Sequence, residues 1–207
     1  MKRALFACCL LFSGAALAEN PLVKGDAEAG ASKAAVCAAC HGPQGNSVNP
    51  QWPSLAGQHA TYTYDQLKAF KSGDRQNAVM MGQVSGLSDQ DMLDLAAYYA
   101  EQKAKPRTGA EEAVEIAQPL WRAGDGERGM PACAGCHGPA GVGNAGASYP
   151  RLAGQQPEYT AMQLRAYRDG DRGQGVNGQM MQHVAQNLSD EEIEALASYA
   201  AGLQPAR

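Results

Sequence analysis

Long apolar runs and clusters of basic residues are both missing from most of this 207-residue sequence. Beyond residue 18 no segment is apolar for long enough to cross a bilayer, so we expect the mature protein to be soluble. Lys2 and Arg3 belong to the N-terminal segment described in the next paragraph. Without them the chain has 15 basic and 21 acidic side chains and no basic patch, which argues against nucleic-acid binding. No useful stretch alternates apolar and polar residues, and this disfavours β-sheet.

The one apolar exception is the N-terminal segment. Residues 4–17 follow two basic residues and are too few to span a membrane, and Ala16-Leu17-Ala18 supplies the small residues that a signal peptidase needs. We therefore expect residues 1–18 to be a cleaved signal peptide. Cys8 and Cys9 make a poor lipidation site, because almost no apolar sequence precedes them.

The rest of the sequence contains one series of segments twice, in the same order. The matched segments are 25–30 and 124–129, 37–42 and 133–138, 53–58 and 150–155, 66–70 and 163–167, and 87–89 and 188–190. So many ordered matches indicate a tandem duplication of one domain. We expect one domain over residues 19–104 and another over 113–207, joined by a linker at 105–112 that contains proline and glycine.

Each copy is typical of a small helical domain. A helix is expected to lead into each Cys-x-x-Cys-His motif, an amphipathic helix is expected over residues 62–72, and a short helix over 113–122. The closing helices should begin at Ser88 and Ser189, because an acid three residues later completes the pattern that satisfies free backbone amides. A loop with paired methionines is expected before each closing helix. The sequence thus predicts an all-α fold of two tandem domains.

The strongest chemical signal is a repeated Cys-x-x-Cys-His motif. Its members are Cys37, Cys40 and His41 in the first copy, and Cys133, Cys136 and His137 in the second. Spacings of three and four residues place the reactive side chains on one side of a helical turn. Two thiols at that separation can form thioether bonds to the vinyl groups of one haem, and the adjacent histidine can then bind the iron. The sequence predicts two covalently bound haem c groups.

Three other readings of the cysteine pairs are weaker. A thioredoxin-like redox pair would need a strand–helix context that is missing here. A zinc site would have to join the two repeats across the 92 residues between Cys40 and Cys133. Neither that site nor simple disulfides would explain the histidine that follows each pair. Haem attachment explains all three residues of each motif.

Each copy also offers a methionine pair as the second axial ligand. The pairs are Met80-Met81 and Met180-Met181. An isolated methionine usually fills a core, but a repeated pair in a polar segment is harder to explain in that way. Measured from the serine that begins the closing helix, Met80 and Met181 share a distance of eight residues, whereas their neighbours lie at seven and nine. If the two copies share their geometry, Met80 and Met181 are the ligands.

Two further histidines could compete for an iron. His183 lies two residues after Met181, and His59 stands where the second copy has Gln156. The ordinary interpretation of both is a surface or helix-start histidine.

Together these motifs resemble the class I cytochrome c domain, in which Cys-x-x-Cys-His is followed by Pro-x-Leu-x-Gly, a ligand methionine and a C-terminal helix. Pro-x-Leu-x-Gly occurs at residues 53–57 and 150–154. The duplication, the secretion signal and the spacing from methionine to Leu-Ser-Asp are similar to those of dihaem cytochromes c4, over nearly the whole mature chain. The resemblance implies two domains related by a pseudo-two-fold axis, with His/Met ligation and facing haem edges. It also implies that Pro53 and Pro150 each offer a carbonyl to the proximal histidine, which would orient it.

Two irons with both axial positions filled leave no place for a substrate, so we expect one-electron transfer and no enzymatic activity. The resemblance implies a carrier in the bacterial periplasm that serves a terminal oxidase. The electron source would be a quinol-oxidising complex or another redox carrier, and peripheral association with membrane complexes is compatible with this role. A haem subunit of a larger oxidase or dehydrogenase would use the same ligands and stays an alternative. A dihaem peroxidase would need an open iron and acid–base groups beside it, and no such cluster stands out.

Overall fold

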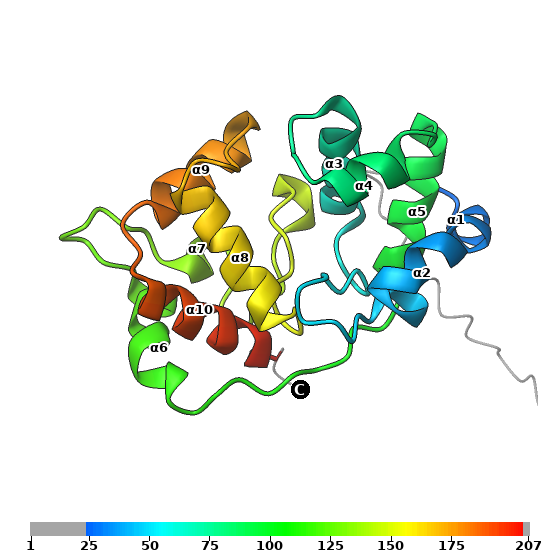
Figure 1. The fold of residues 1–207 in the computed structure, drawn as a ribbon. Coiled ribbons are helices and arrows are strands. Elements are labelled where there is room, and N and C mark those ends of the chain that lie inside the picture. The colour runs from blue at the N-terminus through cyan, green and yellow to red at the C-terminus, as the bar shows by residue number, and fades with distance from the viewer. Residues whose placement is uncertain (1–23, 205–207) are drawn as a thin grey trace, which may run out of the picture.

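The structure is a computed structural model that describes residues 24–204; the expected signal peptide lies outside these residues. Within this range the chain forms helices and no strand, apart from two isolated β-bridges, so the prediction of an all-α fold is confirmed. Figure 1 shows two halves side by side, α1 to α5 in one and α6 to α10 in the other. No helix within residues 24–204 combines the length and the apolar character needed to cross a membrane.

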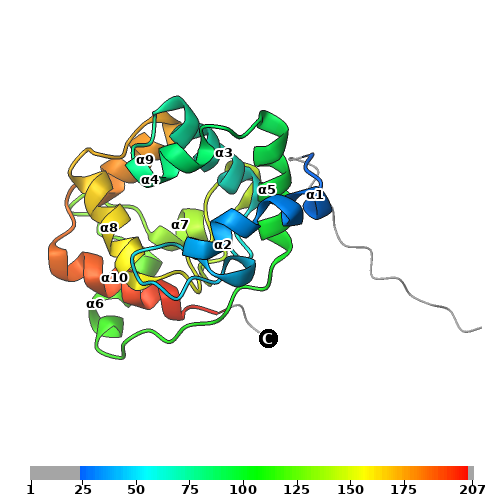
Figure 2. The same ribbon diagram turned by 45° about the vertical axis from the view of Figure 1, so that its right-hand side comes forward.

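The two halves repeat one order of helices. The first contains α1 (Ala27–Lys33), α2 (Ala35–His41), the 3-10 turn η1 (Pro43–Gly45), α3 (Ala60–Ser72), α4 (Ala78–Val84) and α5 (Asp89–Glu101). The second contains α6 (Ala113–Ala123), α7 (Cys133–His137), η2 (Ala145–Ala147), α8 (Pro157–Arg168), α9 (Gly175–Ala185) and α10 (Asp190–Gly202). Helix α5 packs against α1 and α3, and α10 packs in the same way against α6 and α8, as Figures 1 and 2 show.

The closing helices begin where the sequence predicts. The Ser88 hydroxyl accepts the Asp91 amide at 3.1 Å, and the Asp91 carboxylate accepts the Ser88 amide at 2.8 Å. Ser189 and Glu192 repeat this reciprocal cap at 3.1 and 2.9 Å. Each cap satisfies two amides that the first turn of a helix leaves free.

The segment before the second cysteine motif differs from the prediction of a helix leading directly into it. Asp26 and Asp125 cap in the same way, each accepting two backbone amides through one carboxylate oxygen. After Asp26 the chain continues as α1, whereas after Asp125 it turns back and pairs with Met130. The turn forms because Gly129 has φ +66°, a conformation that favours glycine, and because Pro131 cannot donate a helical hydrogen bond. Helix α6 therefore precedes this turn, and α7 is a single short turn around the motif.

The expectation of a loop around the methionine pairs was wrong. Met80 and Met81 lie in α4, and Met180 and Met181 lie in α9. The Asn77 side chain begins α4 by accepting the Met80 amide at 3.0 Å, an N-cap that the sequence pattern did not single out. Helix α9 has 11 residues and α4 has seven, so the second copy carries about one extra helical turn.

The segment between the halves is extended and bonded to both of them. The Lys105 amide donates to Asn46 in the first half at 2.9 Å. Arg107 donates to the carbonyls of Ser47 and Gly154, one in each half, at 3.1 Å. These contacts limit the freedom of the two halves to move apart.

The two halves differ in the number of apolar side chains that they bury without a cofactor. The second half has one large cluster of buried apolar side chains, in which Trp121 and Ile193 are almost fully enclosed. The corresponding cluster in the first half has only Ala34, Leu95 and Tyr99 as its buried members. Apolar burial is the main favourable contribution to folding, so the first half has less stabilisation of its own.

Asp94 compensates in part by joining α1 to α5. It is 4% exposed and accepts the Asp26 amide at 2.9 Å, the Gln90 amide group at 2.8 Å and the Lys33 ammonium at 3.3 Å. Burial alone would raise the pKa of Asp94, but these donors outweigh it and hold the pKa below its usual range.

We expect Asp94→Ala to lower the free energy of unfolding by about 2 kcal/mol, because it leaves buried donors without an acceptor. Since the folded-state pKa is depressed, the stabilisation is present above about pH 4 and is lost as pH falls through that lower value. Urea unfolding followed by circular dichroism at pH 7 and pH 3 would measure both effects. Asp94→Asn, which keeps one acceptor, should lose less. Equal stability of native and Asp94→Ala protein at pH 7 would contradict the assignment.

Candidate haem sites in a shared cavity

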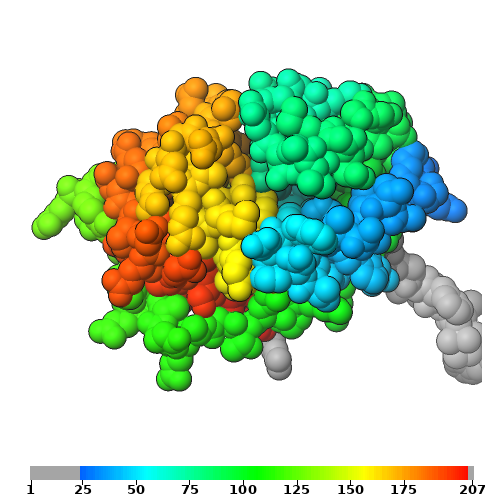
Figure 3. Space-filling model, in the orientation of Figure 1, coloured from blue at the N-terminus to red at the C-terminus, as the bar shows by residue number. Residues whose placement is uncertain are grey.

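Both halves line a single cavity of about 1090 Å³. Ligand pockets in proteins usually measure about 300–1,000 Å³, so this space is large even for one sizeable ligand. It follows the seam that Figure 3 shows between the first half and the yellow and orange helices of the second. The four cysteines and both histidines of the two motifs line it.

The histidines of the two motifs, His41 and His137, are held in matching ways. His41 Nδ1 lies 2.8 Å from the Pro53 carbonyl oxygen, and His137 Nδ1 lies 3.0 Å from that of Pro150. A ring that donates Nδ1–H to a carbonyl presents Nε2 on its other side. Burial lowers the pKa of His41 and His137, which favours the neutral imidazole that a metal requires.

The surroundings of the cysteines do not suit the rival chemistries. The four described cysteines form no disulfide. Burial raises the pKa of Cys37 and raises that of Cys133 to about 11, whereas a redox-active Cys-x-x-Cys pair needs a lowered value. Within residues 24–204 no three His, Cys, Asp or Glu side chains gather into a metal site, so a shared zinc site has no ligand cluster.

Several buried polar atoms point to a cofactor in the cavity. Thr63 Oγ1, Tyr99 Oη and Trp121 Nε1 are buried and have no hydrogen-bond partner among the described residues. All three side chains line the cavity. An unpaired buried polar atom costs about 1–3 kcal/mol, so three such atoms in the lining of one cavity indicate a missing partner there. A large, mostly apolar group with a few acceptors at its edge fits this lining.

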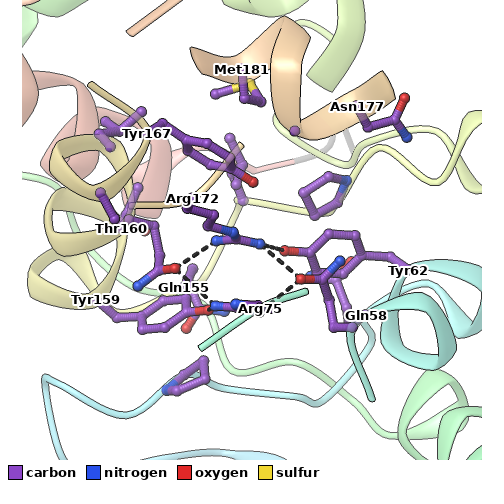
Figure 4. Close-up of a pocket in the computed structure, with 18 of the residues that line it drawn as sticks. Gln58, Tyr62, Arg75, Gln155, Tyr159, Thr160, Tyr167, Arg172, Asn177 and Met181 are labelled. Carbon is purple, nitrogen blue, oxygen red and sulfur yellow. Dashed lines mark hydrogen bonds between the residues drawn. The ribbon is translucent and has the colours of Figure 1, made fainter. Parts of the chain in front are cut away.

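The two methionines of each pair differ in exposure. Met80 and Met181 are half-buried and line the cavity, and Figure 4 shows Met181 at its edge. Met81 and Met180 are exposed, at 38% and 40%. Met180 also contributes to the lining, so the separation is less complete in the second half.

The two competing histidines lie outside the lining. His183 is exposed on α9 and bonds to Gln186 through Nδ1 at 3.0 Å. His59 Nε2 contacts the Val142 carbonyl in the other half at 2.8 Å. Burial lowers the pKa of His59, so the neutral ring is favoured as the donor in this contact between the halves.

Two glutamines that the sequence analysis did not single out form hydrogen bonds between the halves. Gln58 accepts the Arg151 amide at 2.8 Å and donates to the Arg151 carbonyl at 2.9 Å. Gln155 makes the same pair of bonds to Ser54 at 2.7 and 2.9 Å. The contacts are reciprocal, as a pseudo-two-fold axis requires. The sequence does contain a signal for this pair: the same residue type, glutamine, occurs at equivalent positions of the two copies, 97 residues apart.

Replacing both Gln58 and Gln155 with alanine should destabilise the contact between the halves. Each change removes the partner of two backbone amides and of one carbonyl, and an unpaired buried polar group costs about 1–3 kcal/mol. Hydrogen exchange at the amides of Arg151 and Ser54 should accelerate together, and the urea midpoint should fall. Gln83→Ala, an exposed change on α4, is the matched control. Unchanged hydrogen exchange at both amides would contradict a stabilising role for these glutamine contacts.

Comparison with known proteins agrees with this geometry. The sequence model of the cytochrome c family matches residues 27–103 and 124–204, one copy in each half. Cytochrome c4 of Thiocapsa roseopersicina is 48% identical over 181 residues, covering 86% of this chain and 93% of that protein. A thiosulfate dehydrogenase electron acceptor from Stutzerimonas stutzeri is 40% identical over 181 residues, covering 85% and 83%.

The crystal structure of reduced recombinant cytochrome c4 from Pseudomonas stutzeri superposes with a TM-score of 0.84 at 45% identity, covering 87% of this chain and all of that one. The arrangement of the two halves is thus shared with a solved cytochrome c4. The chain belongs to the cytochrome c family, as a cytochrome c4: a dihaem electron-transfer protein with two covalently bound haem c groups.

Proposed function

We propose that Cys37 and Cys40 bind the first haem through thioether bonds, and that His41 and Met80 are its axial ligands. The corresponding residues for the second haem are Cys133, Cys136, His137 and Met181. A single observation supports the set: the proposed residues of both halves line one shared cavity. We also propose domain boundaries at residues 19–104 and 113–207, each domain holding one haem; the separate family matches at residues 27–103 and 124–204 support them.

The chain's own residues would keep both irons closed to substrate. Haem iron supplies one-electron transfer between Fe(II) and Fe(III). The Pro53 and Pro150 carbonyls orient the histidines, and a methionine thioether favours the reduced state. The mostly apolar lining limits the access of water. With a histidine and a methionine on each iron, no position would be left for a peroxide to bind, so the proposed ligands favour electron transfer over peroxidase chemistry.

We further propose that the protein is periplasmic, with residues 1–18 removed, and that it passes single electrons from respiratory donors to a terminal oxidase. A quinol-oxidising complex is one proposed donor. The related protein named as a thiosulfate dehydrogenase electron acceptor supports a dehydrogenase as another. Mass spectrometry of the periplasmic fraction should find a chain that begins at Glu19.

Optical spectra and haem quantitation of the purified holoprotein test the haem sites. We expect two haems per chain, both low-spin and both with an iron–methionine charge-transfer band when oxidised. One haem per chain, or a high-spin resting iron, would contradict two equivalent electron-transfer centres. Addition of catalytic amounts of the protein to bacterial membranes supplied with a quinol should raise oxygen uptake. If the rate of oxygen uptake did not change and thiosulfate dehydrogenase reduced the protein rapidly, the dehydrogenase would be the electron donor and the quinol-oxidising complex would not.

A further inference from the structure

Each half places one buried aromatic donor in the cavity wall, but the two donors come from different helices. Tyr99 is in α5 and Trp121 is in α6, and each is 2% exposed. The Tyr99 hydroxyl and the Trp121 ring nitrogen both lack a hydrogen-bond partner among the described residues. Cys37 packs against the small apolar cluster that contains Tyr99. The two halves therefore share a donor in the wall but differ in its origin and in its chemistry.

The two aromatic rings occupy corresponding places. Counted from the serine that begins each closing helix, Tyr199 is the equivalent of Tyr98. The Tyr99 ring lies 5.0 Å from the Tyr98 ring. The Trp121 ring lies 6.0 Å from the Tyr199 ring. By the same count the equivalent of Tyr99 is Ala200, which also lines the cavity. The same space is thus filled from α5 in the first half and from α6 in the second.

The Tyr99 hydroxyl lies close enough to the Cys37 sulfur to affect it. Burial raises the pKa of Tyr99, so the hydroxyl keeps its proton and can donate it to an acceptor. Burial also raises the pKa of the Cys37 thiol, and the Tyr99 hydroxyl partly offsets this rise, as a donor to the sulfur does. A thioether sulfur has no proton and can only accept. A thioether at Cys37 therefore offers the acceptor that the buried hydroxyl lacks.

The sulfur of Cys133 in the second half has different surroundings. It lies 3.9 Å from the carbonyl oxygen of Leu120, which is an acceptor and not a donor. Burial raises the pKa of Cys133 to about 11, and no side-chain donor in the described part of the chain offsets that rise. Ala200, which stands where the first half has Tyr99, has no polar side-chain atom. The second half thus lacks the hydroxyl that lies near the cysteine sulfur of the first.

We propose that Tyr99 donates a hydrogen bond to the thioether sulfur of Cys37 and so raises the reduction potential of the first haem, whereas the second haem has no such donor. The proposal rests on the proposed haem sites. Tyr99 is a positioning residue that acts on the haem through Cys37. Reduction adds negative charge to the haem, and a donor at the attached sulfur stabilises that charge. The exchange of Tyr99 for Ala200 therefore makes the two haems unequal, although both have the same types of axial ligand.

A redox titration of the holoprotein followed by NMR, which observes each haem separately, tests the proposal. Tyr99→Phe removes only the hydroxyl. It should shift the equilibrium of the first haem toward Fe(III) by about threefold, or about 28 mV. The second haem should keep its native potential. Tyr199→Phe removes a hydroxyl from a ring that does not line the cavity, and this control should shift neither haem.

A double-mutant cycle locates the acceptor. Cys37→Ala removes the proposed acceptor and keeps the thioether of Cys40. In that background Tyr99→Phe should leave the potential of the first haem unchanged, because the two changes remove one and the same contact. The carbon–sulfur stretching band in the resonance Raman spectrum should shift in Tyr99→Phe protein and stay unchanged in the Tyr199→Phe control.

The outcomes separate this contact from other effects of the ring. No shift in Tyr99→Phe, an equal shift of both haems, or a full shift in the Cys37→Ala background would overturn the proposal. If Cys37→Ala protein loses its first haem, the Raman band decides: a shifted band in Tyr99→Phe supports the proposal, and an unchanged band overturns it. If Tyr99→Phe protein itself does not hold two haems, NMR of the native reduced protein decides. A slowly exchanging hydroxyl proton close to Cys37 supports the contact, and a rapidly exchanging one overturns it. Only one haem in the native protein would instead count against the proposed function.

Discussion

Met80→Leu and Met181→Leu should each lower the reduction potential of one haem by a few tenths of a volt, because axial ligands set haem potentials over a range of about 0.8 V. The iron–methionine charge-transfer band should fall to half its intensity in either variant. Met81→Leu and Met180→Leu should leave both potentials and the band near their native values. These side chains are exposed, and leucine keeps a similar volume.

The helices explain why one sulfur of each pair is favoured. Met80 lies four residues before Val84, and Met181 lies four residues before Ala185; Val84 and Ala185 are 1% and 0% exposed. Residues four apart share a face of a helix, so both chosen methionines lie on the buried face. Helix α9 has about one turn more than α4. Because a full turn was added, Met181 stays on the buried face of its helix, although the sequence offset between the two copies changes.

Optical redox titration with haem quantitation would measure the effect. Each variant should keep two haems, because the cysteines are intact, and this separates lost ligation from lost cofactor. The comparison is most decisive in the second half, where Met180 also lines the cavity. If Met180→Leu abolished the band and Met181→Leu did not, the assignment by spacing from the closing helix would be wrong.

The sequence was most informative where one short segment determines its own structure. The caps at Ser88 and Ser189 and the cavity-lining positions of His41 and His137 follow from residues at most four positions apart. Such local patterns are independent of how the two halves pack. The α-helical state of Met80 and Met81 was missed because its cap, Asn77, stands among glycines and polar residues that are typical of a loop.

Contacts across the seam could not be predicted in the same way. Gln58 and Arg151 are 93 positions apart, and Arg172 and Tyr62 are 110 apart. Their side chains are polar, so hydrophobic periodicity does not indicate them. The repeat placed Gln58 and Gln155 at equivalent positions, but equivalence does not say that they reach into opposite halves. Only the pairing of the two domains gives these residues partners.

Removing the thioether cysteines of one half should separate the stabilities of the two halves. Cys37→Ala with Cys40→Ala should reduce the haem content from two to one per chain, and so should Cys133→Ala with Cys136→Ala. The two double variants should differ in what happens to the protein. We expect the first half to unfold locally when its haem is lost, and the second half to stay largely folded.

The difference follows from the apolar clusters and from the cavity walls. In the second half, Trp121 also lines the cavity, but it belongs with Ile193 to a cluster of 13 buried side chains. In the first half, Leu95 and Tyr99 line the cavity and belong to a cluster with three buried members. Loss of the haem exposes those side chains to water, and the first half has fewer other buried apolar side chains to stabilise it than the second half has. Asp94 strengthens the contact between α1 and α5, but it does not replace the lost apolar contacts.

Limited trypsin digestion followed by mass spectrometry would detect the difference. Cleavage after Lys68 and Lys71 in α3 should be at least about tenfold faster in the first double variant than in native protein, equivalent to about 1.4 kcal/mol of lost protection. Cleavage after Arg165 and Arg168 in α8 should accelerate much less in the second double variant. The single variant Cys40→Ala keeps one thioether and should retain two haems and native protection. Equal acceleration in α3 and α8 would mean that the halves unfold as one unit, with the interdomain contacts outweighing the difference between their cores.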